Sequence, residues 1–182
     1  MTAFHVSTPT LSYKYWLNGV LYWLYQNTDK SESDYFNALQ HLARKFIFQR
    51  YLNEKQIDYF DLIYGNQTID DFKIDQSKLS FGNIENNFVF NYLDFLIYCD
   101  AENSNDKVIK NFKFTQRSSV EHFYAQQIEG ERDKLDHENL HRFGNLCPIS
   151  SSKNSSIGNR LPSAQRDYFM PEIRKGKIDT LK

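Results

Sequence analysis

The feature that most constrains the fold of this chain is a change of pattern near residue 118. Before it, apolar residues recur at helical spacing over long segments. After it come two short β-type runs, residues 118–124 and 146–149, with a polar loop between them. A run of serines follows the second of them and suits the start of a short helix. The order strand, loop, strand, helix predicts a compact ββα unit.

The segments before residue 100 are typical of helices. Apolar residues repeat at helical intervals over 11–26 and 33–52, and residues 86–99 are apolar on nearly every side. The aromatic residues of the first segment are predicted to be helix core, and a base-stacking platform is the alternative. His41 lies beside the second apolar stripe without a Cys, Asp or second His at ligand spacing. We therefore predict a structural or surface role for it.

Shorter elements complete the predicted secondary structure. A helix over residues 54–64 should end at Gly65 in a left-handed conformation, and residues 108–115 alternate loosely enough for a strand. A brief helix is expected over 136–143, and Pro162 fits the first turn of a final helix. The predicted fold is α+β and mostly α-helical, with a helical region over residues 1–107 and the ββα unit within residues 108–182.

Charge is distributed unevenly along the chain. Residues 141–182 carry eight Lys or Arg against three acids, a net charge of +5, so the first 140 residues carry −6 of the total of −1. A basic C-terminal quarter suits an anionic partner such as DNA. A solvated surface without a partner explains the same composition.

The two cysteines, Cys99 and Cys147, have no paired spacing, which argues against a disulfide framework or a Cys-rich zinc site. The chain shows no secretory leader pattern, and its most apolar runs are too short and too interrupted to span a bilayer. We therefore expect a soluble, cytoplasmic protein with no membrane partner. No glycine-rich phosphate loop is present either.

An acid and a histidine, Glu121 and His122, are adjacent at the end of the first β-type run. Hydrolysis of a phosphodiester requires a base for the attacking water and a divalent cation for the phosphate charge. His122 is the natural base because its ordinary pKa lies near neutrality. Glu121 and the side-chain oxygen of Asn154 are hard ligands suited to Mg²⁺ or Mn²⁺. Asn145, after Gly144, is expected to orient His122.

These residues resemble a known family. Val120-Glu121-His122, then His141-Arg142-Phe143-Gly144-Asn145-Leu146, then Asn154, Asn159 and Tyr168 are similar to the pattern of the DUF1524 domain. That domain is the HNH-type (ββα-metal) nuclease module at the C-terminal end of GmrSD modification-dependent restriction endonucleases. The resemblance covers roughly residues 118–168.

The resemblance implies a metal-dependent DNA endonuclease that serves in restriction, a phage-defence function. It implies His122 as general base, Asn145 as the orienting residue, Glu121 and Asn154 as ligands of Mg²⁺ or Mn²⁺, and Asn159 as a supporting position. DNA is the implied partner, with four basic residues as candidate contacts: Arg142, Lys153, Arg160 and Arg166. A DUF262-type, nucleotide-using domain or subunit is the further partner implied, so this chain would be one part of a longer or split protein.

Other interpretations remain open. The run Phe123-Tyr124-Ala125-Gln126 lacks the proline common in the family, and Gln165 stands where the family often has a lysine. A catalytically degenerate module of the same fold, which binds DNA or a partner subunit, is the main alternative. A purely helical assembly subunit is another, and it requires that the ββα unit be absent. His141 is expected to pack or cap at the end of its helix rather than to act in catalysis.

Overall fold

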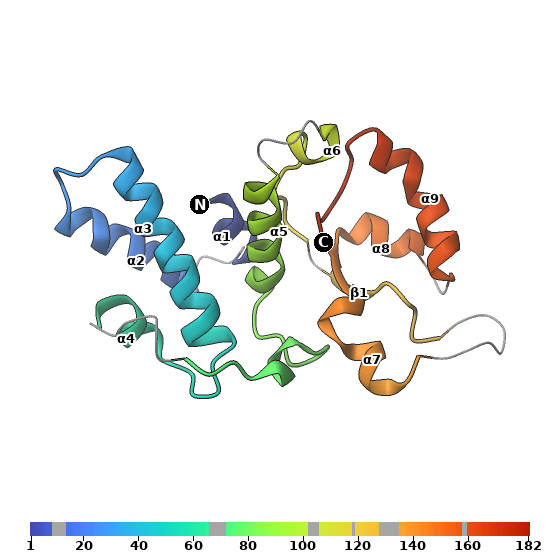
Figure 1. Cartoon of the computed structure of the whole chain (residues 1–182), viewed down its shortest axis with the longest axis horizontal. Helices are drawn as coiled ribbons and strands as arrows, with labels where there is room; N and C mark the ends of the chain where they lie inside the picture. Colours follow the sequence, from blue (N-terminus) through green and yellow to red (C-terminus); the bar gives the residue numbers. More distant parts are fainter. Residues whose placement is uncertain (9–13, 66–71, 102–105, 118, 128–134, 158–159) are drawn as a thin grey trace.

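The computed structural model describes residues 1–8, 14–65, 72–101, 106–117, 119–127, 135–157 and 160–182. Figure 1 shows the first helices at one end of the molecule, a central upright helix, and the hairpin with the last helices at the other end. The elements, in chain order, are α1 (Thr2–Ser7), α2 (Tyr15–Gln26), α3 (Glu32–Lys45), the π-helix η2 (Phe46–Tyr51), α4 (Tyr59–Tyr64), the 3-10 helix η3 (Gln76–Leu79), α5 (Phe88–Asp100), α6 (Lys107–Lys110), β1 (Ser119–His122), α7 (His137–His141), the 3-10 helix η4 (Phe143–Asn145), β2 (Leu146–Ile149), α8 (Ser151–Ile157) and α9 (Pro162–Arg174). The chain is α+β and mostly helical, as predicted.

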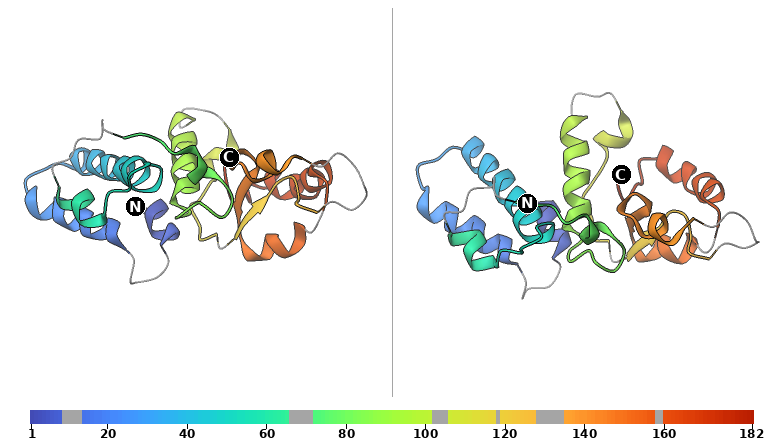
Figure 2. Two further views of the ribbon diagram at one scale, coloured as in Figure 1. Left: turned by 90° about the horizontal axis from the view of Figure 1, so that it is seen from below. Right: turned by 60° about the horizontal axis from the view of Figure 1, so that its bottom comes forward.

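The central helix α5 carries the core, as its apolar sequence predicts. Phe88, Val89 and Phe90 are buried at its start, and Phe88 stacks on Phe4 of α1 with 4.3 Å between ring centroids. Phe4 also stacks on Trp16 of α2, at 5.3 Å. A helix that is apolar on most sides can contact elements on several faces at once. Helix α5 therefore stands between the N-terminal helices and the hairpin, and both views of Figure 2 agree.

The start of α3 and the length of α4 differ from the sequence prediction. Helix α3 begins after Ser31, whose hydroxyl accepts from the Asp34 amide while the Asp34 carboxylate accepts from the Ser31 amide, a capping box. Of the predicted helix over 54–64 only Tyr59–Tyr64 forms. Just before this segment, Asn53 forms an antiparallel β-bridge with Ile74, which holds the chain extended there. Gly65 has φ −76°, so the predicted left-handed conformation was wrong.

The predicted strand over residues 108–115 was also wrong. A one-turn helix, α6, forms over Lys107–Lys110, and its first turn is capped by the Asp106 carboxylate, which accepts from the Val108 amide at 2.7 Å. Phe112 is buried next to it. Local capping by an aspartate outweighs the weak alternation because no neighbouring strand is present in the described residues to pair with this segment.

The C-terminal ββα unit forms as predicted. Strands β1 and β2 pair antiparallel, with Glu121 opposite Cys147 and His122 opposite Leu146. Helix α8 follows β2 directly and contacts β1, and Pro162 occupies the first turn of α9. The interpretation as a purely helical subunit is thereby excluded. Among the described residues, no helix has the length and apolarity that crossing a bilayer requires.

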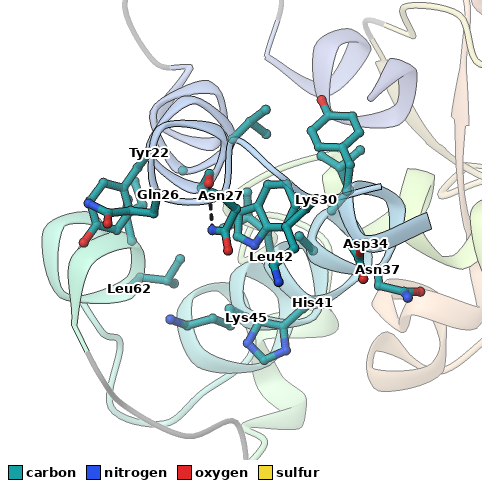
Figure 3. A pocket seen from close by; sticks show the side chains of 17 residues that line it. Tyr22, Gln26, Asn27, Lys30, Asp34, Asn37, His41, Leu42, Lys45 and Leu62 are labelled. Atoms are coloured by element: carbon teal, nitrogen blue, oxygen red, sulfur yellow. Dashed lines mark hydrogen bonds between the residues drawn. The ribbon is translucent and has the colours of Figure 1, made fainter. Parts of the chain in front are cut away.

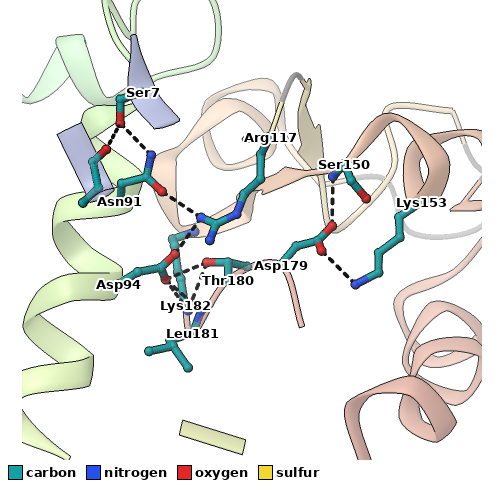
Figure 4. Close-up of polar contacts among 11 residues, drawn as sticks. Ser7, Asn91, Asp94, Arg117, Ser150, Lys153, Asp179, Thr180, Leu181 and Lys182 are labelled. Carbon is teal, nitrogen blue, oxygen red and sulfur yellow. Dashed lines mark hydrogen bonds and ion pairs between the residues drawn. The ribbon is translucent and has the colours of Figure 1, made fainter. Parts of the chain in front are cut away.

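A buried ion pair joins α5 to the hairpin and the last residues of the chain (Figure 4). The Asp94 carboxylate is fully buried and accepts from Arg117 Nη1 at 2.9 Å. Its other oxygen accepts from the Thr180 hydroxyl at 2.8 Å and the Leu181 amide at 2.7 Å. Directly before Thr180, the Asp179 carboxylate accepts from the Ser150 amide at 2.8 Å. The C-terminal segment is thus held against both α5 and the end of β2.

Candidate active site

The two faces of the hairpin separate the predicted site residues into two groups. Side chains of successive strand residues point to opposite faces. Asn154 of α8 donates from Nδ2 to the Ser119 hydroxyl at 3.2 Å, so Ser119 marks the face that α8 covers. Alternation places Glu121 on that same face and His122 on the other. No hydrogen bond among the described residues joins His122 to Glu121 or Asn154.

His122 ends β1 in a small aromatic enclosure and is only 7% exposed. Its Nε2 lies 3.0 Å from Nδ1 of His141 in α7, which requires one of the two rings to donate. The ring of Phe81 lies 4.5 Å from the His122 ring, centroid to centroid. The amide nitrogen of Gln126 lies 3.3 Å from His122 Nδ1. The histidine is therefore held from three sides.

Burial lowers the pKa of His122 from its ordinary value, and the nearby His141 lowers it further. Burial acts because a charged imidazolium loses hydration there, and His141 acts because a second positive charge would be repelled. A lowered pKa leaves the ring neutral at neutral pH. The neutral ring is the form that can accept a proton from water.

Asn145 holds the loops on both sides of His122. Its side-chain oxygen accepts from the Tyr124 amide at 2.7 Å, and its amide nitrogen donates to the carbonyls of Leu140 at 2.8 Å and Tyr124 at 3.1 Å. The carbonyl of Asn145 also accepts from the Phe123 amide at 2.8 Å. Asn145 thus connects the segment after His122 with the end of α7. Its contacts are with the backbone, and none is with the His122 ring.

The C-terminal Lys182 adds a second anchor to the same loop. Its ammonium group donates to the carbonyls of Phe143, at 2.6 Å, and Leu146. These carbonyls flank the turn that leads from η4 into β2. Lys182 therefore stabilises the turn that presents Asn145.

The residues predicted to hold a metal supply a small oxygen donor set. The described residues contain no group of three or more His, Cys, Asp or Glu placed to bind an ion. Glu121 and Asn154 nevertheless share one face of the hairpin, and Asn154 uses its nitrogen for Ser119, which leaves its amide oxygen without a partner among the described residues. Mg²⁺ in nucleases and polymerases is often held by one or two carboxylates, with waters and substrate phosphates completing the shell. The donor set fits such an ion. Asn159 lies outside the described residues.

The four residues predicted to contact nucleic acid differ in whether their side chains already form ion pairs. Arg142 forms an ion pair with Glu138, and Lys153 pairs with Asp179 at 2.9 Å. Arg160 and Arg166 are exposed, and neither has an ion pair within the described ranges. The guanidinium of Arg160 lies over the ring of Tyr168, 4.6 Å from its centroid. Exposed, unpaired arginines are the better placed to meet a phosphate.

The sequence prediction missed the closeness of His141 to His122. The available signal was the i, i+4 spacing of His137 and His141, which places both rings on one side of a short helix. The rings of His137 and His141 lie 4.5 Å apart. Nothing in the sequence indicated Phe81, which reaches the site from a distant segment. Its amide donates to the His141 carbonyl at 2.9 Å. Gln165, which replaces a family lysine, is buried and donates to the Arg160 carbonyl at 3.1 Å, a structural contact.

The hairpin with its packed helix defines a small α+β domain of ββα type, and comparison with known families assigns it. The family model described as the C-terminal domain of GmrSD restriction endonucleases matches residues 66–174. The match covers more than half of the chain, so the chain belongs to this family. It is therefore a nuclease module of the restriction endonuclease type, a class of hydrolase that cuts DNA. No curated protein and no solved structure matched the chain.

Proposed function

We propose that this chain is a metal-dependent DNA endonuclease module of a modification-dependent restriction system that acts in phage defence. His122 is the general base, and Glu121 and Asn154 hold Mg²⁺ or Mn²⁺. The observation that carries the proposal is the match to the C-terminal domain of GmrSD restriction endonucleases over residues 66–174, which includes His122 at the end of β1 with its ring held by His141 and Gln126. The catalytic module is residues 108–182. A DUF262-type, nucleotide-using domain or subunit would supply recognition of the modified base.

We assign His122 the neutral tautomer with its proton on Nε2, although the amide nitrogen of Gln126 lies at similar distances from Nδ1 and Nε2, 3.3 and 3.4 Å. With its proton on Nε2, the ring donates to Nδ1 of His141, and its own Nδ1 accepts from Gln126. Nδ1 is therefore the atom that takes the proton from water once the amide of Gln126 gives way. Glu121 and His122 lie on opposite faces of β1, and the strand ends at His122, so a phosphate at this strand end is the one that could meet both groups. A divalent cation held by Glu121 there would neutralise charge on the scissile phosphate. Asn145 keeps the loop after β1 in place during this step.

His141→Ala is expected to lower the cleavage rate about 10-fold to 100-fold, the scale typical of groups that orient a functional residue. It should also move the acid limb of the pH–rate profile to higher pH, because His141 is one cause of the lowered His122 pKa. His141→Gln retains a hydrogen-bond acceptor and should recover part of the rate. A pH–rate profile identical to that of the parent in both variants would exclude a positioning role.

Glu121→Ala is expected to raise the Mn²⁺ concentration needed for half-maximal cleavage by about tenfold or more and to lower the maximal rate, because an oxygen ligand is lost. Plasmid nicking measured across a metal titration provides the readout. Glu54→Ala, which removes an exposed acid at the other end of the chain, is the matched control. A titration curve unchanged from the parent would remove Glu121 from the metal site.

A degenerate module that binds DNA or a partner is the second candidate. It is favoured by the low exposure of His122 and by the lack of a hydrogen bond from His122 to Glu121 or Asn154 in the described part of the chain. An assay of plasmid and phage DNA with Mg²⁺ and with Mn²⁺ separates the two. Cleavage supports the nuclease. DNA binding without cleavage in either metal identifies the degenerate module.

A further inference from the structure

A cavity lies away from the hairpin, among α2, α3 and α4. Its volume is about 540 Å³, within the range of small-molecule sites in proteins. Figure 3 shows its side chains, with His41 and Lys45 of α3 next to one another. In Figures 1 and 2 the helices α2 and α3 lie at the opposite end of the molecule from α7, α8 and α9. The cavity is therefore separate from the candidate active site.

The cavity is lined by more basic than acidic side chains, and one of them, Lys45, is mostly buried. Lys45 is only 7% exposed, yet no described residue forms an ion pair or hydrogen bond with it. Lys30 and His41 also line the cavity and likewise have no polar partner among the described residues. The lining acid is Asp34, and its carboxylate is occupied by the Ser31 cap. A bound anion would give the Lys45 ammonium a partner in a charge-assisted hydrogen bond.

The directions in which the pKa values of the lining residues are shifted agree with this geometry. Burial lowers the pKa of Lys45, and burial followed by repulsion from Lys45 lowers the pKa of His41. Arg44 lowers the pKa of His41 as well, whereas the acid that lines the cavity, Asp34, interacts with Lys30. A phosphate in this cavity could bind Lys45 and His41 together, because these two residues are four apart on α3 and lie on the same side of the helix.

The remaining walls suit a flat aromatic group. Trp23 and Tyr22 of α2 and Tyr35 of α3 line the cavity together with the aliphatic side chains of α3 and α4. Three amide side chains also line it, and two of them, Gln26 and Asn37, make no hydrogen bond to described residues. Bases stack on aromatic rings and hydrogen-bond along their edges. The aromatic residues of α2 were predicted as helix core: Trp16 lies in the core and Tyr15 packs against it, whereas Tyr22 and Tyr25 are exposed.

We propose that this cavity binds a phosphorylated nucleoside, with the base against Trp23 and the phosphate against Lys45. The ligand is either a free mononucleotide or a nucleotide within a single DNA strand, because the recognised chemistry is the same. The cavity does not include the residues of the candidate active site, so the proposal can be correct whether or not the chain cleaves DNA.

Isothermal titration calorimetry of the full chain with each of the four deoxynucleoside monophosphates tests the proposal. The corresponding nucleosides, inorganic phosphate and a short single-stranded oligonucleotide form the other arms. Lys45→Met should weaken mononucleotide binding about tenfold or more, the scale of losing a charged hydrogen bond. Lys30→Met, at an exposed position, should weaken it less without affecting folding. Lys55→Met, at an exposed position that does not line the cavity, is the matched control and should bind as the parent does.

Thermal unfolding of the ligand-free variants provides a second readout. Because Lys45 is buried without a partner, Lys45→Met should melt at the same temperature as the parent or higher. A large loss of stability would mean that Lys45 has a structural partner and would overturn the proposal. Equal binding of nucleoside and nucleotide, equal binding of inorganic phosphate, or no binding in any arm would overturn it too. Preference for the oligonucleotide over the monophosphates assigns the ligand to a DNA strand, and the reverse assigns it to a free nucleotide.

Discussion

His122→Ala is expected to lower metal-dependent DNA cleavage by about 10²-fold or more, the usual scale for losing a general base. The rate should fall because no other histidine among the described residues stands at the end of β1. His141 does not occupy the position of the lost ring, because it ends α7 and not β1. The measurement is initial plasmid nicking rate at saturating Mn²⁺, for parent and variant prepared in parallel.

The control variant for this experiment is His137→Ala. His137 packs its ring on His141, 4.5 Å between centroids, but it has no polar contact with His122. Its rate should stay within a few-fold of the parent. Far-ultraviolet circular dichroism of both variants distinguishes a loss of base from a loss of fold. Cleavage by His122→Ala within a few-fold of the parent would exclude His122 as the base.

Asp94→Ala is expected to lower the free energy of unfolding by about 3–5 kcal/mol, the typical effect of breaking a buried ion pair by removing one partner. Arg117 would remain buried with an uncompensated charge, and two of its nitrogens already lack a hydrogen-bond partner. The Thr180 hydroxyl and Leu181 amide would lose their acceptor as well. Urea unfolding monitored by circular dichroism gives the free energy.

Two further variants make this stability prediction specific. Glu172→Ala removes surface ion pairs with Lys175 and Lys177 and should leave the urea midpoint nearly unchanged. The double variant Asp94→Leu with Arg117→Met replaces both charges by apolar groups and should recover much of the lost stability. If Asp94→Ala unfolds within about 1 kcal/mol of the parent, the ion pair does not hold the C-terminal segment in place.

The sequence by itself determined the local elements whose causes lie within a few residues. The all-round apolar pattern produced α5, Pro162 produced the first turn of α9, and the ordering of two short β-type runs before a serine-rich helix produced the ββα unit. The adjacent residues Glu121 and His122 indicated the candidate active site in the same way, because they are neighbours in the sequence. Each of these signals depends on spacing along the chain, which a sequence displays directly.

Only the tertiary structure decided which side chains meet. Residues 108–115 became a one-turn helix because no strand was beside them in the described fold, and Phe81 reached His122 from forty residues away in another segment. Lys153, basic in sequence, is paired with Asp179, whereas Lys45 lines a cavity and has no ion pair within the described part of the chain. Burial, pairing and pKa depend on contacts between residues far apart in the chain. Such contacts are set by packing, so spacing alone does not reveal them.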